Sequence, residues 1–503
     1  MPPHPLPRRQ RAESHSSVDG ESAAAASCAS LIGDKVAASM ADQQFDLIVI
    51  GSGPAGQKGA ICAAKLRKRV AVIDRTLMMG GVSVHTGTIP SKTVREAIFQ
   101  LTGLAVKSFY GNNYRGNREI SIQDLAFRVN TIIARETEVI RAQLRRNGVF
   151  IFQGKAQFTD AHTVEVNGDG ENAVLRGEHV LIACGTRPAH NPDILFDGKR
   201  ILDTDEIAGP GMGELPRELI VVGAGVVGLE YASFLAALGV EVTLIDQRPT
   251  ILDFVDREIV EALAYHLRQM GTTFRLGEKV TRVGIDPQRD RVFAELESGK
   301  KILADGLLYA VGRQANGDQL QLQAAGVEHD TRGKITVNSH YQTVVPHIYA
   351  AGDVIGFPAL ASTSMEQGRL ASCHMYGLPS ESIPDLFPYG IYTIPEISTV
   401  GQTEEKLTAA KVPYEVGVAK YNELAKSMML GDETGMLKLL FDRNTHKLLG
   451  VHAIGQRATE IIHIGQAVLS YGGTIDYFRD TVFNYPTLAE AYKVAALDGL
   501  NKL

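Results

Sequence analysis

Two stretches of the chain show the same succession of apolar and polar positions. Each begins with a short run rich in β-branched residues, Phe45–Ile50 or Glu218–Val222, which stops at closely spaced glycines. A helix-like segment follows, and a second apolar run then ends in an acid, Asp74 or Asp246. Apolar runs that alternate with helical segments predict parallel strands in an α/β fold. The pattern therefore predicts two strand–helix–strand units within one chain.

The glycines of both units have the spacing GxGxxG. They are Gly51, Gly53 and Gly56 in the first unit and Gly223, Gly225 and Gly228 in the second. In such a motif the first glycine makes a tight turn, the second lets the backbone approach a pyrophosphate, and the third lets helix and strand pack closely. Asp74 and Asp246 each follow the first glycine by 23 residues, where an acid can accept a ribose hydroxyl. We therefore predict two dinucleotide sites, with one site and a decayed copy as the alternative.

Further apolar patterns predict the elements around these units. Strands are expected at 149–152, 163–166, 179–183, 307–311, 348–351 and 436–441, and helices around Arg95, up to about Asn147, at 365–370, at 460–471 and at 488–500. The stretch from about residue 384 onward lacks a phosphate-binding glycine loop. It is therefore predicted to be a dimerisation domain.

Composition narrows the function classes. A length of 503 residues suggests about three or four domains. The net charge is −6 and the chain has no long basic run, so nothing indicates a nucleic-acid partner. The chain also has no apolar run of about 18 residues, so no membrane-spanning helix is predicted. The four cysteines lack metal-ligand or CxxC spacing. This pattern predicts no metal site and is typical of a reducing compartment, here the cytoplasm.

Residues 1–44 are rich in Ser, Ala and Pro and are predicted to be a flexible extension. Three arginines near the start could belong to an organelle address, but nearby acidic residues do not fit such a peptide. Met40 lies just before the first predicted strand, so a shorter natural start is the alternative.

From about residue 45 the chain resembles the pyridine nucleotide–disulfide oxidoreductase family. Four landmarks match in order: the first GxGxxG, the stretch Gly80–Lys92 with its Ile-Pro-Ser-Lys, the second GxGxxG with Glu230, and Ala351-Gly352-Asp353. The resemblance implies two Rossmann-like dinucleotide-binding domains, for FAD and NAD(P), and a C-terminal α+β dimerisation domain that forms a homodimer.

The resemblance also implies the domain order. After the extension at 1–44, an FAD-binding domain consists of residues 45–192 and 316–384. The NAD(P)-binding domain at 193–315 lies between these two parts, and the dimerisation domain covers 385–503.

Site residues follow from the same resemblance. FAD would lie on the first glycine motif, with Asp74 at the adenosine ribose and Asp353 near the ribityl–pyrophosphate region. Lys92 and Glu230 match the family's ion pair beside the flavin N5, and NAD(P)H would lie on the second unit. The other expected cofactor-binding residues are Thr88, Gly185, Arg248, Gly312 and Gly352.

Two departures from the family concern thiol chemistry. Ser83 and Thr88 stand where disulfide reductases have their redox-active cysteines, and a hydroxyl cannot replace a thiol in that exchange. Tyr485 stands where those enzymes have a His that acts as acid and base, and a tyrosine of pKa about 10 is a poor base at neutral pH. The stretches Gly87–Lys92 and Phe483–Thr487 resemble instead the transhydrogenase branch of the family.

We therefore predict FAD-dependent hydride transfer between NADPH and NAD⁺. One nicotinamide site would serve both nucleotides in turn, in a ping-pong mechanism through reduced flavin. Lys92 and Glu230 are the predicted catalytic pair, with a structural salt bridge as the alternative. Tyr485 is predicted to fill the space of the missing His across the dimer interface.

Arg248 is the residue predicted to let the site bind NADPH as well as NAD⁺. It lies two residues after Asp246 and could contact the 2′-phosphate of NADPH, with a solvated surface charge as the alternative. Two other functions remain open from the sequence. One is an NAD(P)H dehydrogenase with a quinone or dye acceptor, and the other is a non-catalytic flavoprotein that senses NAD(P)H.

Overall fold

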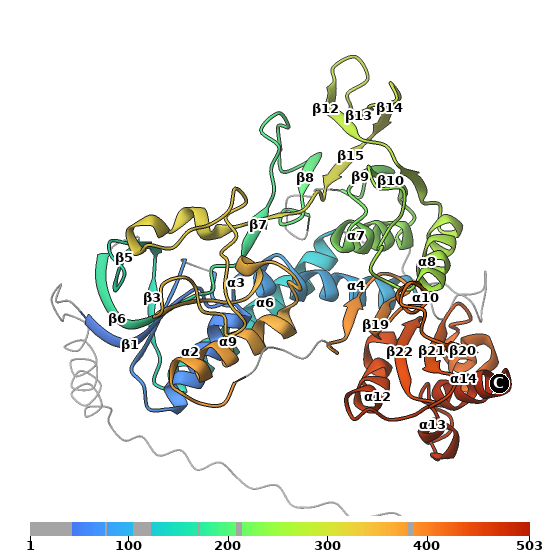
Figure 1. Cartoon of the computed structure of the whole chain (residues 1–503). Coiled ribbons are helices and arrows are strands. Elements are labelled where there is room, and N and C mark those ends of the chain that lie inside the picture. The colour runs from blue at the N-terminus through green and yellow to red at the C-terminus, as the bar shows by residue number, and fades with distance from the viewer. Residues whose placement is uncertain (1–42, 76–77, 104–121, 169–171, 208–213, 381–385) are drawn as a thin grey trace, which may run out of the picture.

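A computed structural model describes residues 43–75, 78–103, 122–168, 172–207, 214–380 and 386–503 (Figure 1). It has the predicted α/β architecture, with one mainly parallel and one parallel sheet and a C-terminal α+β part. The expected extension at 1–44 lies outside the described residues, except that the first strand already begins at Gln43. Within those described ranges, no helix combines the length and apolar character needed to cross a bilayer.

The first unit is a seven-stranded sheet of order β3-β2-β1-β6-β5-β4, with β17 paired to β6. Strands β3, β2, β1, β6 and β17 are parallel, whereas β4 and β5 join as an antiparallel edge. The strands are β1 (Gln43–Ile50), β2 (Val70–Asp74), β3 (Phe150–Gln153), β4 (Lys155–Phe158), β5 (Thr163–Asn167), β6 (Asn172–Ile182) and β17 (Ile348–Ala350).

Strand β1 shows why this sheet is covered on both faces. Alternate side chains of a strand point to opposite faces. Leu47 and Val49 pack with the helices α2 (Pro54–Lys65) and α9 (Ala361–Met375), while Ile48 and Ile50 belong to the core on the other face. The two helices lie close together: a Cβ added at Gly368 would come within 2.0 Å of the Ala55 carbonyl oxygen. This contact needs glycine.

Helices α3 (Gly81–His85) and α4 (Thr88–Thr102) lead away from the first unit towards the second (Figure 1). Helix α6 (Ile122–Arg146) packs on α4. These helices confirm the expected helical segments around Arg95 and before Asn147.

The second unit is a five-stranded parallel sheet of order β11-β10-β9-β15-β8. A three-stranded antiparallel sheet, β12-β13-β14, extends from it at the top of Figure 1. The elements are β8 (Ile201–Asp203), β9 (Glu218–Val222), α7 (Val226–Ala237), β10 (Glu241–Asp246), α8 (Arg257–Gln269), β11 (Thr273–Leu276), β12 (Val280–Asp286), β13 (Arg291–Leu296), β14 (Lys301–Ala304) and β15 (Gly306–Tyr309).

The chain passes between the two units twice, and both passages lie side by side. Strand β7 (Thr186–Pro188) leads out of the first unit and β16 (Arg313–Ala315) leads back, and the two pair in antiparallel register. Arg187 of β7 forms an ion pair of 2.6 Å with Asp318, just after β16. The second unit is therefore attached to the first through a two-stranded connection.

The C-terminal part is an antiparallel sheet of order β18-β19-β22-β21-β20, covered by helices that include α12 and α14. Its elements are β18 (Tyr389–Ile391), β19 (Ile397–Gly401), α10 (Glu404–Ala409), β20 (Tyr414–Lys420), α11 (Ala425–Leu430), β21 (Met436–Asp442), β22 (Leu448–Ile454), α12 (Ala458–Ser470), α13 (Asp476–Asp480) and α14 (Glu490–Leu500).

A buried ion cluster joins the C-terminal part to the second unit. Lys438 of β21 is fully buried, and its Nζ lies 2.9 Å from Asp256 Oδ1 and 2.9 Å from Glu258 Oε2. Glu404 of α10 supplies a third carboxylate. Burial alone would lower the pKa of Lys438, but hydrogen bonds to these three carboxylates raise it. The ammonium group thus sits among the three acids as their counter-charge.

We expect Lys438→Met to lower the midpoint of thermal unfolding strongly. Removing one partner from a buried ion pair leaves uncompensated charge and costs about 3–5 kcal/mol. Lys447→Met is the matched control, since Lys447 is exposed on the connection between β21 and β22. Equal midpoints for both variants in a calorimetric scan would contradict a stabilising role for the cluster.

Candidate functional site

The first glycine loop is shaped by contacts that leave no room for a side chain. Gly51 has φ +106°, and a Cβ there would lie 2.3 Å from the Ala183 carbonyl oxygen. A Cβ on Gly56 would lie 1.9 Å from the Gly51 carbonyl oxygen. Gly53 differs, because a Cβ there would meet nothing within 4 Å. Its backbone lines an open space at the N-terminus of α2, where free N–H groups can bind an anion.

Asp74, at the end of β2, is tied to this loop. Its Oδ2 accepts the Ser52 backbone N–H at 2.7 Å and also contacts the Ser52 hydroxyl. Burial raises the pKa of Asp74, while the hydrogen bonds from Ser52 oppose this shift. The carboxylate is therefore fixed beside the glycine loop.

The second glycine loop repeats this construction. A Cβ on Gly223 would lie 2.4 Å from the Ala310 carbonyl oxygen, and one on Gly228 would lie 2.0 Å from the Gly223 carbonyl oxygen. Gly225, like its counterpart in the first loop, would meet nothing within 4 Å. Asp246 Oδ2 accepts the Ala224 backbone N–H at 2.7 Å. The two loops therefore share a geometry as well as a spacing.

Asp246 is also bound by Arg248, which lies two residues further along the chain. Arg248 donates its backbone N–H at 2.8 Å, its Nε at 3.0 Å and its Nη2 at 2.8 Å to the Asp246 carboxylate. Burial raises the pKa of Asp246, but the hydrogen bonds from Arg248 and Ala224, together with the charge of Arg248, lower it by more, so the net shift is downward. Asp246, predicted to bind a ribose hydroxyl, is thus paired with Arg248, predicted to bind a 2′-phosphate.

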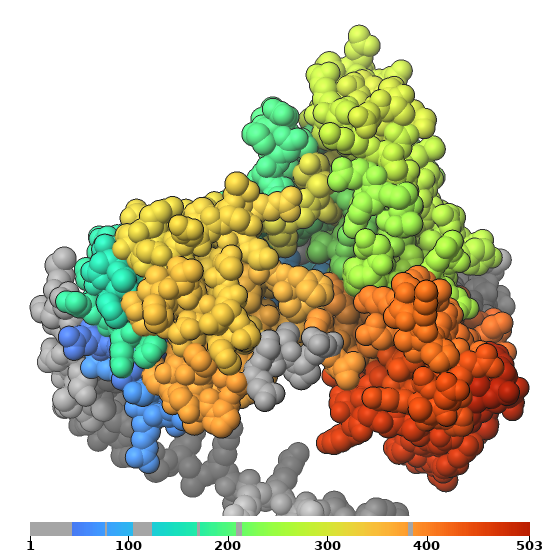
Figure 2. Space-filling model, in the orientation of Figure 1, coloured from blue at the N-terminus to red at the C-terminus, as the bar shows by residue number. Residues whose placement is uncertain are grey.

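A cavity of about 860 Å³ lies where the two units and the C-terminal part meet, and Figure 2 shows one face of this junction. Of the residues predicted from the sequence, those that line it are Gly51, Gly53, Asp74, Thr88, Lys92, Gly185, Glu230, Gly352 and Asp353. Those that do not are Gly56, Gly223, Gly225, Gly228, Asp246, Arg248, Gly312 and Tyr485. The cavity thus belongs mainly to the first unit.

The Lys92–Glu230 pair bridges the two units inside this cavity. Lys92 lies on α4 and Glu230 on α7, and the Lys92 Nζ lies 2.9 and 2.8 Å from the two carboxylate oxygens. Glu230 is only 2% exposed. The lysine keeps 26% of its side chain accessible, so the positive partner is the one presented to the cavity.

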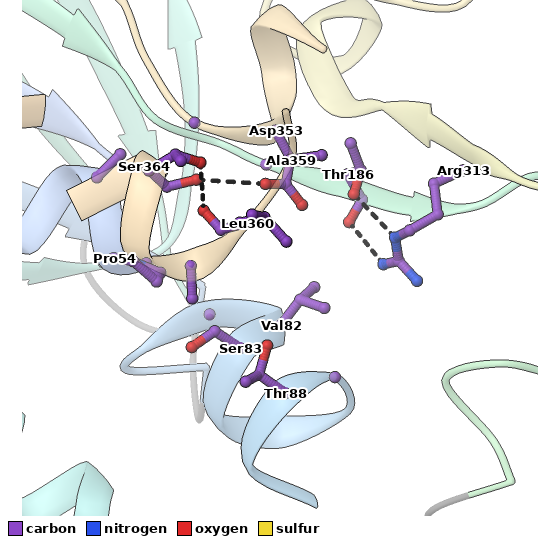
Figure 3. A pocket seen from close by; sticks show the side chains of 18 of the residues that line it. Pro54, Val82, Ser83, Thr88, Thr186, Arg313, Asp353, Ala359, Leu360 and Ser364 are labelled. Carbon is purple, nitrogen blue, oxygen red and sulfur yellow. Dashed lines mark hydrogen bonds between the residues drawn. The ribbon is translucent and has the colours of Figure 1, made fainter. Parts of the chain in front are cut away.

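Figure 3 shows the cavity wall around Asp353. Ser364 donates to Asp353 Oδ1 at 3.4 Å, and burial raises the pKa of this aspartate. Opposite it, Arg313 donates to the Thr186 hydroxyl at 2.9 Å and to the Thr186 carbonyl at 3.1 Å, and forms an ion pair of 2.8 Å with Asp205. The sequence analysis missed Arg313 and Asp205, although Arg313 directly follows the predicted Gly312.

At the two positions where disulfide reductases of the family have cysteines, this chain has side chains with hydroxyl groups. Ser83 of α3 and Thr88 of α4 both line the cavity and lie near each other in Figure 3. Cys184 also lines it, which the sequence analysis did not predict, but burial raises the pKa of its thiol to about 12. A thiol with that pKa stays protonated at neutral pH and is a poor nucleophile.

Tyr485, the third predicted catalytic residue, lies away from this cavity. Its side chain is 71% exposed on the C-terminal part. Within the described part of a single chain it has no contact with the Lys92–Glu230 pair. Its predicted role across a dimer interface therefore stays a prediction.

Comparisons with known proteins agree with this geometry. The family model "Pyridine nucleotide-disulphide oxidoreductase" matches residues 45–368, and the model of that family's dimerisation domain matches residues 387–496.

Curated relatives match over almost their whole length. Soluble pyridine nucleotide transhydrogenase from Mycobacterium tuberculosis is 51% identical over 463 residues, which is 92% of this chain and 98% of the relative. The protein of the same name from Escherichia coli is 46% identical, over 91% of this chain and 98% of the relative.

Solved structures of the same fold include more distant proteins. LpdA from M. tuberculosis aligns with a TM-score of 0.83 at 27% identity, over 90% of this chain and 99% of that one. The HOCl-induced flavoprotein disulfide reductase RclA from E. coli aligns with a TM-score of 0.81 at 25% identity, with the same coverage.

We expect Asp353→Asn to stabilise the ligand-free protein at pH 7. A carboxyl whose pKa is raised by folding destabilises the folded state at pH values above its folded pKa, and this penalty vanishes below the ordinary value of 3.8. The gain in unfolding midpoint should therefore shrink as the pH falls towards 4. The exposed Asp193→Asn is the control for thermal scans across a pH series. A gain that does not change with pH would contradict burial of the charge as its cause.

Proposed function

The chain belongs to the pyridine nucleotide-disulphide oxidoreductase family, and from this premise we propose that it transfers hydride between NADPH and NAD⁺ with FAD as its cofactor. One observation carries this proposal. The cavity retains the Lys92–Glu230 pair, while Ser83 and Thr88 occupy the positions of the family's redox-active cysteines. A site with a charged pair and without a dithiol can pass hydride from one nucleotide to another but cannot reduce a disulfide.

The residues of the first unit fit FAD. Gly53 leaves its backbone open at the N-terminus of α2, where the pyrophosphate would be bound. Asp74 would hold the adenosine ribose, and Asp353 would face the ribityl–pyrophosphate region. When bound, FAD accepts hydride from one nicotinamide nucleotide and gives it to another.

Lys92 supplies a fixed positive charge to the reaction. The carboxylate of Glu230 holds the ammonium group at 2.8 Å, so its position is set before any substrate arrives. A preorganised charge stabilises negative charge that develops during reaction, at no cost of reorganisation. Lys92 would contact the cofactor directly, whereas Glu230 orients the Lys92 ammonium group.

Both nucleotides would use the second glycine loop in turn, since FAD takes the first. Gly223, Gly225 and Gly228 would bind the pyrophosphate, and Gly185 and Gly312 would lie at the edges of the site. Asp246 and Arg248 would together face the ribose that differs between NAD⁺ and NADPH. An arginine that can leave Asp246 for a 2′-phosphate would let one site accept both nucleotides.

We also propose that the protein acts as a homodimer in the cytoplasm. The match of residues 387–496 to the family's dimerisation domain supports the homodimer. In it, Tyr485 would cover the flavin pocket of the other subunit by shape. The free cysteines support a reducing compartment.

Steady-state kinetics tests the proposed reaction. With NADPH and an NAD⁺ analogue both varied, we expect parallel double-reciprocal plots, because the donor must leave before the acceptor binds. Intersecting lines would refute a single shared site. Turnover with a quinone but not with NAD⁺ would favour a dehydrogenase, and a yellow protein without turnover would favour a sensor.

The nucleotide preference tests Arg248. We expect Arg248→Ala to weaken NADPH use by about 1.5–3 kcal/mol, the range for a charged hydrogen bond, with little change for NADH. The measurement is kcat/KM for each nucleotide. Arg289→Ala, at an exposed turn of the second unit, is the control. An equal loss for both nucleotides would make Arg248 a general stabiliser of the loop.

A further inference from the structure

The Lys92–Glu230 pair has a third partner that the sequence did not single out. The segment Tyr392–Glu396 connects β18 to β19 in the C-terminal part, and it reaches into the boundary between the two dinucleotide units. Its first residue contacts both members of the pair. This contact makes the C-terminal part of the same chain one wall of the cavity.

Tyr392 makes two different contacts there. Its backbone N–H donates to Glu230 Oε1 at 2.9 Å, and the Lys92 Nζ lies 4.8 Å from the centre of its ring. A cation this close to an aromatic face is attracted to it. All three residues line the same cavity. The ammonium group is thus held between a carboxylate and an aromatic ring.

The segment that carries the ring is itself anchored to both dinucleotide units. The buried Arg95 of α4 forms an ion pair of 3.2 Å with Glu396, which is also buried, and its Nε donates to the Thr393 carbonyl at 3.1 Å. The Ile394 N–H donates to the Ser233 hydroxyl of α7 at 3.1 Å. Both units therefore hold the segment in place.

The surroundings also make room for the ring and keep it neutral. A Cβ on Gly390 would lie 3.3 Å from Tyr392 Cε2, closer than most such contacts, so glycine lets the ring lie here. Burial raises the pKa of the Tyr392 phenol, and the nearby Glu396 raises it further. The phenol thus adds no charge of its own at neutral pH, and its role lies in the ring face and the backbone N–H.

We propose that Tyr392 is a positioning residue for hydride transfer, which holds the Lys92 ammonium through its ring and the Glu230 carboxylate through its backbone N–H. This inference rests on the proposed function, in which Lys92 stabilises charge at the cofactor. The Lys92 ammonium group donates to the Glu230 carboxylate and, at 3.3 Å, to the neighbouring Ser91 hydroxyl. The aromatic face of Tyr392 adds a contact that these hydrogen bonds do not supply, and so helps to keep the long, flexible lysine side chain in one orientation.

Three variants of the flavin-containing enzyme separate this role from simple packing. Tyr392→Phe keeps the ring face, Tyr392→Leu keeps an apolar side chain without one, and the exposed Tyr265→Leu on α8 is the control. We expect Tyr392→Leu to slow flavin reduction by NADPH by about three- to tenfold, the range for loss of a cation–π contact. Its flavin midpoint potential should become more negative, with less than about a twofold change in KM for NADPH. Tyr392→Phe and Tyr265→Leu should match the parent in the rate of flavin reduction, the flavin midpoint potential and KM for NADPH.

Two results in this series would overturn the proposal. One is an unchanged rate and potential in Tyr392→Leu, and the other is equal impairment of Tyr392→Phe, which would assign the role to the hydroxyl group. If Tyr392→Leu does not retain flavin, Tyr392→Met, which fills the space with an unbranched chain, gives the same comparison.

A chemical measurement tests the contact without relying on turnover. Acetic anhydride acetylates a lysine faster when its amine is more accessible and more often unprotonated. Mass spectrometry gives the acetylation rate of Lys92 relative to the other lysines. We expect faster labelling of Lys92 in Tyr392→Leu than in the parent, and an unchanged rate in Tyr392→Phe. Unchanged labelling in Tyr392→Leu would refute the contact even in an active enzyme. A parent that holds flavin but does not transfer hydride would refute the proposed function and leave this contact to be decided by labelling.

Discussion

A single buried charge is the point at which the three parts of this protein meet. Glu230 is 2% exposed, and a carboxylate removed from water needs partners to be tolerated. Its partners come from outside its own unit: Lys92 from the α4 helix and the Tyr392 N–H from the C-terminal part. Displacement of either part would remove one of these partners from the buried carboxylate. The electrostatic requirement of one side chain therefore contributes, together with the Lys438 cluster and the Arg95–Glu396 pair, to the geometry of the cavity in which hydride transfer is proposed.

The local features of the chain could be predicted from its sequence. Each glycine loop depends partly on a contact within its own strand–turn–helix segment, such as that of Gly56 with the Gly51 carbonyl, and the GxGxxG spacing already contains that contact. The strands and helices around them also follow from apolar periodicity. The first strand nevertheless begins at Gln43, since pairing of β1 with β6 extends it beyond its apolar run.

The remainder of the site depends on contacts between distant segments, which periodicity does not reveal. Asp205 and Tyr392 come from connections between elements, and Arg313 comes from the short strand β16 between the two units, yet all three line the same cavity. The pairing of Arg248 with Asp246 was likewise absent from the sequence analysis, which placed Asp246 at a ribose hydroxyl and Arg248 at the 2′-phosphate of NADPH. The role of residues in short polar segments at domain boundaries therefore could not be predicted from sequence motifs.

The neighbouring passages β7 and β16 have a consequence for the order of folding. Residues 201–309 contain all five strands of the second sheet, so that sheet can form as soon as this stretch has been synthesised. The first sheet is completed only later, because its strand β17 at 348–350 pairs with β6 from far earlier in the chain. Pairings over such long separations form slowly, and domains tend to fold as units during synthesis. The inserted unit can therefore be complete on the ribosome while its host still exposes the open edge of β6.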